Sequence, residues 1–406
     1  MSLASPPVPA PAAARAAAAL PPAIYLLSLC SFAFGLSEFI AAGLLSGMAR
    51  DLHASVAAAG GAIAAYALGA AIGAPILTAL LARRPTRQVL AATMIVLALG
   101  SVAMAMAPGL GVLLGVRFAV GLAHGVFMAV ASHAATSLVD PGRAGRALSI
   151  VWLGLTLALA GGVPLGTWLG AVSSWRSVFA AIGALALCGG AGLLWAMPRA
   201  RQQAPAVSAL ASLRAILRPP LLLAAGVAAL VSVATFSFFT YVSPFLLQLG
   251  GLGAGWLGAA MLCFGVCAIG GNLLGGWCAD RADAQRSAVL ALAALALNLS
   301  LFYLLRGQPV ALLVLCGSLG MLFFALVTLS TMRLLRLAQQ HCPGSDAVAA
   351  GLNIAAFNLG TAAGGALGGM LIVAFGLASI ALGGALAALL AMLVLWLQCR
   401  KLDAPL

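Results

Sequence analysis

The chain alternates between long apolar stretches and short polar breaks. Most stretches reach 20 residues or more, the length that lets a helix rising 1.5 Å per residue cross a hydrocarbon core of about 30 Å. No alternation of polar and apolar residues typical of a membrane β-barrel accompanies them. The pattern predicts twelve membrane-spanning helices, approximately at residues 22–48, 55–82, 88–107, 110–139, 145–172, 174–197, 219–247, 253–280, 285–305, 308–337, 346–374 and 376–398.

The longest polar connection divides these helices into six and six. It covers residues 198–218, PRARQQAPAVSALASLRAILR, and we expect it to be a cytoplasmic linker. The predicted units are a disordered cytoplasmic tail at 1–21, a six-helix bundle at 22–197, a second bundle at 219–398 and a short cytoplasmic tail at 399–406.

The two halves repeat weakly at an ungapped offset of 198 residues. The matching pairs are Pro21–Pro22 with Pro219–Pro220, Gly73 with Gly271, Arg83 with Arg281, Gly162 with Gly360, and Gly166 with Gly364. Repeated six-helix units occur in secondary transporters that bind substrate between the halves near the midplane of the membrane. We therefore expect an all-α integral membrane protein made of two pseudo-symmetric six-helix bundles.

Composition agrees with this class and excludes a water-soluble protein. Hydrophobic residues make up 64% of the chain and charged residues 7%, against roughly 25% charged residues in soluble domains. The mean hydropathy is +1.15. The lipid bilayer is thus the first partner that the sequence implies.

The basic residues orient the helices, because loops rich in Arg and Lys stay in the cytoplasm. With the N-terminus inside, 16 of the 20 Arg and Lys residues fall in cytoplasmic loops or tails, and only Arg50, Arg176 and Arg306 lie outside. Both termini are therefore expected in the cytoplasm. The same bias explains the net charge of +13 without a nucleic-acid partner.

Signatures of an enzyme are missing from the sequence. It contains neither HExxH nor GxSxG, and its single lysine, Lys401, rules out a Walker A loop for ATP. The eight cysteines form no CxxC pair and fit small buried hydrophobes. We expect no enzyme activity, no metal and no cofactor.

Two permanent charges, Glu38 and Arg117, lie clearly inside the predicted spans. An ionisable group at that depth costs several kcal/mol and is a functional candidate by default. Glu38 lies about 12 Å from the outer end of its helix and Arg117 about 10 Å from the outer end of the fourth helix, counted at helical rise. The two residues therefore share a level in the outer half.

The fourth span carries a polar and small face. Arg117, Gly121, His124 and Met128 follow at intervals of four, three and four residues, so they point to one side, toward a cavity or a closely packed helix. Glu38 is the candidate proton carrier, because burial favours the neutral acid and an open cavity the carboxylate; the alternative is a structural Glu. His124 is a candidate for proton relay, because histidine titrates near neutral pH, and the alternative is a packing histidine.

Four polar residues of the second half are candidates for the substrate cavity. They are Tyr241, Asn272, Asn353 and Asn358, and the alternative for each is a hydrogen bond between helices.

Several segments together resemble a known family. They include GLSEFIAAGLL at 35–45, GAPILTALLARRPTRQVL at 73–90, VRFAVGLAHGVF at 116–127, GGVPLGTWLG at 161–170 followed by SWRSVF, YVSPFL at 241–246, GNLLGGWCADR at 271–281 and GLNIAAFNLGTAAGGALGG at 351–369. In this order they are similar to the major facilitator superfamily, drug:H⁺ antiporter type with twelve spans, and to its arabinose-efflux-permease-like subgroup.

The resemblance implies a part in proton relay for Arg117, with a structural ion pair as the alternative, and it also implies a set of gating residues. These are Arg83, Arg87, Gly162, Pro164, Gly166, Asp280 and Arg281. Two positions depart from the family pattern: Ala82 stands where an aspartate is usual, and Leu159 where an asparagine is frequent. For the glycines and Pro164, simple close packing of helix five is the alternative to a seal against proton leak.

The sequence thus predicts a monomeric transporter that exports a small organic molecule (a drug, a sugar or a nucleoside-like compound) by proton antiport and alternating access. A proton-coupled uptake permease of the same fold and a membrane sensor without transport remain the alternatives.

Overall fold

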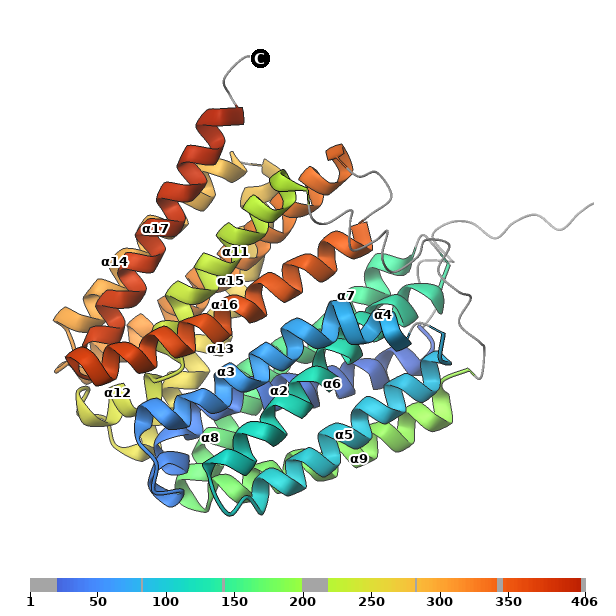
Figure 1. Ribbon diagram of the computed structural model, residues 1–406, viewed down its shortest axis with the longest axis horizontal. Helices are drawn as coiled ribbons and strands as arrows, with labels where there is room; N and C mark the ends of the chain where they lie inside the picture. The colour runs from blue at the N-terminus through green and yellow to red at the C-terminus, as the bar shows by residue number, and fades with distance from the viewer. Residues whose placement is uncertain are drawn as a thin grey trace, which may run out of the picture.

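The computed structural model is helical throughout its described regions, which are residues 20–81, 83–140, 143–198, 218–281, 283–341 and 346–402. Within these ranges, twelve helices are long and apolar enough to cross a membrane, which confirms the predicted number. Figure 1 shows the two halves as separate bundles, the N-terminal one in blue to green and the C-terminal one in yellow to red.

Each half contributes six spans, some built from more than one helical segment. Those of the N-terminal half are α2 (Pro22–Asp51), α3 (Val56–Ile72) with η1 (Gly73–Leu77) and α4 (Thr78–Leu81), α5 (Thr86–Ala105), α6 (Leu110–Ser137), α7 (Ala144–Leu157) with η3 (Ala158–Gly162) and α8 (Val163–Val172), and α9 (Trp175–Ala196). Those of the C-terminal half are α11 (Pro219–Phe239) with α12 (Val242–Gln248), η4 (Ala254–Trp256) with α13 (Leu257–Arg281), α14 (Ala284–Leu304), α15 (Pro309–His341), α16 (Asp346–Phe375) and α17 (Ser379–Leu402). Following the predicted orientation, we call the end that carries the α2–α3 connection the outer end.

Three of the interruptions occur at prolines. Pro75 lies within the π-helical turn η1, and Pro164 comes two residues after η3. Proline has no N–H and its ring collides with the carbonyl four residues earlier, so a regular helix cannot continue through it. Pro244 acts in the same way on the carbonyl of Thr240, and the seventh span breaks at Tyr241 into α11 and α12. The predicted single helix 219–247 is therefore bent near its outer end.

The internal repeat recurs in the packing. A Cβ placed on Gly73 would lie 2.2 Å from the carbonyl oxygen of Leu122, and one on Gly271 would lie 2.2 Å from that of Met321. Thus α13 packs against α15 in the C-terminal half in the same way as η1 packs against α6 in the N-terminal half. The glycines that match at an offset of 198 residues allow equivalent close helix contacts in the two halves.

The halves meet along two helix pairs. One pair is α3 with α16, and the other joins the fifth span to α13. Near the outer end, Ser243 Oγ lies 3.0 Å from Ser46 Oγ, and Tyr241 Oη lies 3.4 Å from the carbonyl oxygen of Ala57, so hydrogen bonds connect the two bundles there.

Candidate functional site

Arg117 is fully buried where α2, α3 and α6 converge. Its guanidinium donates three hydrogen bonds to main-chain carbonyl oxygens: Nη1 to Ser37 at 2.6 Å, Nε to Ala62 at 3.0 Å and Nη2 to Glu38 at 3.4 Å. It also lies over the ring of Tyr66, 4.3 Å from the centroid, in a cation–π arrangement. The guanidinium on α6 thus binds main-chain carbonyl groups of both α2 and α3.

This arrangement explains how the fold tolerates an arginine at that depth. A guanidinium presents five N–H groups in a rigid fork, and carbonyl dipoles can satisfy them without a carboxylate. The bonds to Ser37 and Glu38 also confirm that Arg117 and Glu38 share one level of the bundle.

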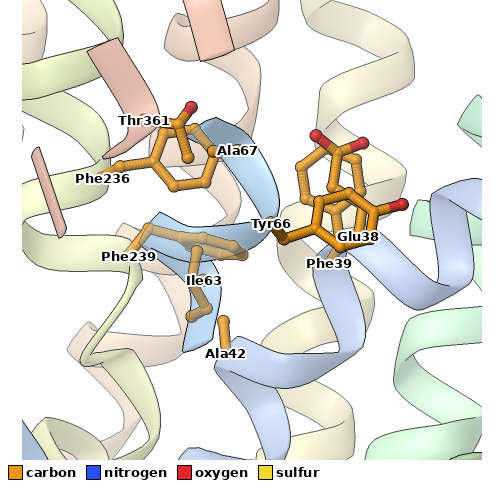
Figure 2. A pocket seen from close by; sticks show the side chains of 9 residues that line it. All are labelled: Glu38, Phe39, Ala42, Ile63, Tyr66, Ala67, Phe236, Phe239 and Thr361. Atoms are coloured by element: carbon orange, nitrogen blue, oxygen red, sulfur yellow. The ribbon is translucent and has the colours of Figure 1, made fainter. Parts of the chain in front are cut away.

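The carboxylate of Glu38 has a different neighbour, His124. Its Oε2 lies 3.9 Å from Nδ1 of His124, and its side chain is 18% exposed. It also lines a small cavity, shown in Figure 2, in which Tyr66 and Ile63 of α3 lie beside it. Glu38 therefore contributes its carbonyl to Arg117 and its carboxylate to the cavity.

His124 lies between two aromatic rings. Its imidazole stacks on Phe34 with ring centroids 5.1 Å apart and planes 9° from parallel, and the ring of Tyr66 is tilted against it at 5.6 Å. Both ring nitrogens are buried and neither has a hydrogen-bond partner. Leaving a buried donor unmatched costs about 1–3 kcal/mol, so the structure keeps a polar group that a purely structural position would not require.

The cavity beside Glu38 lies on the boundary between the halves. It encloses about 10 Å³, close to the space that one water molecule needs. Glu38, Tyr66 and their neighbours form its N-terminal side; Phe236 and Phe239 of α11 and Thr361 of α16 form the opposite side (Figure 2). A carboxylate of one half thus faces an aromatic wall of the other.

That aromatic wall continues into the C-terminal half. Phe236 contacts Phe323, and Phe239 stacks on Phe264 with ring centroids 4.3 Å apart. Phe323 in turn contacts Phe357 edge to face. Aromatic faces of this kind suit flat apolar ligands, since they offer large contact areas with little conformational entropy to lose.

The three predicted asparagines make contacts within the C-terminal half. Thr328 Oγ1 donates to Asn272 Oδ1 at 2.9 Å, and Asn353 Nδ2 donates to Thr331 Oγ1 at 2.7 Å, so α15 is linked to α13 and to α16. Asn358 Nδ2 donates to the carbonyl of Ile354 in its own helix. The Oδ1 atoms of Asn353 and Asn358 are buried without a hydrogen-bond partner, which leaves two acceptors available.

Tyr241, the fourth predicted cavity residue, lies elsewhere. It does not line the cavity beside Glu38; its side chain is inserted between α3 and α16 near the outer end. Its position depends on the break that Pro244 produces in the seventh span.

The residues expected to control gating lie at the connection between the second and third spans, within the fifth span, and at the end of α13. Arg83 is exposed, and Arg87 donates a hydrogen bond to the carbonyl of Leu194 in the same half. The side chains of Asp280 and Arg281, and residue Ala82, lie outside the described part of the structure.

In the fifth span, the small residues face two different neighbours. Cβ atoms placed on Gly162 and Gly166 would meet Phe32 at 2.9 Å and Ile40 at 2.8 Å, so both glycines pack against α2 of the same half. The carbonyl oxygens of Leu159 and Pro164 instead approach α13 of the other half. Close packing, the alternative left open for these residues, is thus observed around them.

Sequence reasoning missed an ionic cluster at the outer end of the N-terminal half. Arg176 Nη2 lies 2.9 Å from Asp51 Oδ2, and Trp175 Nε1 donates to the same oxygen at 3.0 Å. Arg176 Nη1 also donates to the carbonyls of Ala105 and Ala107 at 2.9 and 3.0 Å. The acid and the base are 125 positions apart, and the only signal was the segment SWRSVF.

Comparisons with known proteins agree with this architecture. A family model described as Major Facilitator Superfamily matches residues 27–347. The inner membrane transport protein YdhP of Escherichia coli is 35% identical over 380 residues, which cover 92% of this chain and 95% of that protein. A chloramphenicol resistance protein of Streptomyces lividans is 36% identical over 354 residues, covering 85% and 88%.

A solved structure also has the same fold. The crystal structure of a bacterial homologue of the human lysosomal transporter Spinster superposes with a TM-score of 0.73, covering 93% of this chain and 96% of that one. The sequence identity is 16%, so this likeness concerns the arrangement of the helices.

Proposed function

Because the chain belongs to the major facilitator superfamily, we propose that it exports a small organic molecule in exchange for protons. The two six-helix halves alternate between arrangements that open the central cavity to one side of the membrane or to the other. The protein works as a monomer with both termini in the cytoplasm, and the proton gradient is its energy source.

The observation that carries this proposal is the position of the Glu38 carboxylate. It lies beside His124, at the boundary between the halves, while Arg117 is engaged by carbonyl oxygens. A dry cavity favours the neutral acid and a water-filled one favours the carboxylate, because burial penalises the charged form. Movement of the halves therefore changes the protonation of Glu38.

The residues around Glu38 have separate roles in this mechanism. Arg117 remains bound to the α2 and α3 carbonyls, so Glu38 can gain or lose a proton without loosening the helix packing. His124 exchanges the proton with Glu38 through the 3.9 Å approach of Nδ1 to Oε2. A proton bound from the outside is released to the cytoplasm, and the substrate moves in the opposite direction.

The substrate class follows from the wall opposite Glu38 and from one relative. Phe236 and Phe239 offer apolar ring surface, and the unpartnered Oδ1 atoms of Asn353 and Asn358 can accept hydrogen bonds from a bound molecule. A relative is named a chloramphenicol resistance protein, and this name supports a drug as the substrate. Drugs of this kind are the first candidates, ahead of sugars and nucleosides.

Transport in proteoliposomes tests the proposal. Purified protein is reconstituted with the pH indicator pyranine inside, a pH gradient is imposed, and labelled chloramphenicol is the first compound, followed by a panel of drugs, sugars and nucleosides. Antiport predicts substrate movement against the direction of proton flow, lost in Glu38→Gln. Flow of substrate and protons in the same direction would identify an uptake permease, and no flux of any compound would favour a sensor.

A further inference from the structure

The side chain of Tyr241 is held between a helix of its own half and a helix of the other half. The break at Pro244 turns the residue away from the axis of α11. Its hydroxyl donates to the carbonyl oxygen of Gly365 in α16 at 2.7 Å and lies 3.4 Å from that of Ala57, next to the start of α3. Tyr241 itself is 1% exposed.

Glycines surround the ring on both sides. A Cβ placed on Gly60 of α3 would lie 2.4 Å from the ring and hydroxyl atoms, and one on Gly368 of α16 would lie 2.6 Å from the ring. A Cβ on Gly369 would lie 2.8 Å from the hydroxyl oxygen. These separations are far shorter than any carbon–carbon contact, so the ring fits only because no side chain is present at these positions.

The contacts on the two sides differ in strength. Toward α16, in its own half, the tyrosine has the short hydrogen bond to Gly365 and two glycine surfaces. Toward the N-terminal half it has the long hydrogen bond to Ala57 and the single surface of Gly60. The ring is therefore bound more firmly to α16 than to α3, which suits a contact that forms and breaks between moving bodies.

A second contact beside it also joins the halves. Ser243, two residues after Tyr241, lies with its Oγ 3.0 Å from Oγ of Ser46 in α2. The bent α11–α12 segment thus contacts both α2 and α3 at the outer end.

We propose that Tyr241 is a latch that holds the outer gate closed by packing its ring against Gly60 of α3. When the outer end closes, the ring enters the space above Gly60; when it opens, the ring leaves α3 and stays with α16. This inference rests on the alternating access proposed above, and it assigns Tyr241 a positioning role in place of the cavity role that its sequence suggested.

Disulfide formation across the gate tests the latch directly. The eight native cysteines are first replaced by serine or alanine, and Ser46→Cys and Ser243→Cys are then introduced together. A protease site is placed in the 198–218 linker, so that after cleavage the halves stay joined on a denaturing gel only if the disulfide has formed. In this parent chain we expect fast cross-linking. Gly60→Ala should slow it at least about fivefold, because the new methyl group would collide with the ring.

Two controls separate the latch from general damage. Gly61→Ala is the matched variant, since a Cβ there would meet only the Leu114 side chain at an ordinary 3.4 Å, and it should cross-link as fast as the parent. In a Tyr241→Ala background, Gly60→Ala should have no further effect. Each variant is accepted only if it elutes as a single peak in detergent. If Gly60→Ala fails this criterion, Tyr241→Phe replaces it, because phenylalanine keeps the ring and removes the hydroxyl. We expect cross-linking of Tyr241→Phe to be at least about twofold slower than that of the parent.

Cross-linking by Gly60→Ala at the parental rate would overturn the proposal, as would an equal effect of Gly61→Ala or an effect that persists without the tyrosine. The assay needs neither substrate nor gradient. A failure of proton coupling in proteoliposomes would therefore leave this result intact, and the two proposals can fail independently.

Discussion

The guanidinium of Arg117 donates to the main-chain carbonyl of Glu38, while the carboxylate of the same residue faces His124. Arg117 and Glu38 are therefore neighbours without forming a side-chain ion pair. In the proposed mechanism, Arg117 holds the helices together and Glu38 changes its protonation. A transporter needs this separation, because a residue that must change its charge in every cycle should not also hold the helices together.

Neutralising Glu38 should therefore remove proton coupling and leave the fold intact. In Glu38→Gln the backbone carbonyl that binds Nη2 of Arg117 is unchanged, so we expect the free energy of unfolding to change by less than about 1 kcal/mol. Denaturation in detergent and the pyranine assay measure the two effects. A large loss of stability would mean that the carboxylate does pair with Arg117.

Replacing Arg117, in contrast, should destabilise the fold. Lysine keeps the positive charge but presents it at a single point, so Arg117→Lys cannot reach the carbonyls of Ser37, Glu38 and Ala62 together. We expect a loss of about 3 kcal/mol of stability, the order found when a buried charge loses its partners. Unfolding that matches the parent protein would show that these three bonds contribute little.

The imidazole of His124 offers a third test. In His124→Phe the new ring can keep the stack on Phe34 while both unpartnered nitrogens disappear, so stability should stay level or rise by about 1 kcal/mol. If His124 exchanges protons with Glu38, proton-coupled flux should fall by about a hundredfold.

The matched control for this variant is His133→Gln, which replaces an exposed histidine on the same helix and should leave flux unchanged. Normal flux in His124→Phe would make His124 a packing residue, the alternative that the sequence left open.

Much of the fold was readable from the sequence, because the length of each apolar stretch is a local property and the twelve predicted spans are found as helices. The predicted linker at 198–218 lies almost wholly outside the described residues, and the predicted orientation stays a prediction. The break in the seventh span was less visible. Residues 219–247 form one apolar run, and only Pro244 marked the point where the carbonyl of Thr240 loses its partner. Tyr241 lies directly at that break, and a residue expected in the cavity is found between α3 and α16 near the outer end.

The site was only half readable. Counting along the helices placed Glu38 and Arg117 at one level, and the hydrogen bonds confirm it. The choice of carbonyls as partners could not be predicted, because every residue carries one and only the packing decides which of them face the guanidinium. For the same reason nothing distinguished Phe34 or Tyr66 from the other aromatic residues before the helices were placed.

The contact between α3 and α6 leads to the last prediction. A Cβ placed on Gly121 would lie 2.0 Å from the backbone carbonyl oxygen of Tyr66, and no rotation of a side chain can relieve that collision. Gly121→Ala should therefore push the two helices apart and disturb the bonds of Arg117, one turn away on the same face. We expect a loss of at least about 2 kcal/mol of stability.

Gly115→Ala is the control for this substitution, because the same helix has open space around Gly115 and alanine favours helix over glycine by about 1 kcal/mol. The control should unfold at or above the parental denaturant concentration, while Gly121→Ala unfolds well below it. Equal stability of the two variants would mean that α3 and α6 can separate at little cost. It would contradict the view that the three hydrogen bonds of Arg117 hold these helices at a fixed distance.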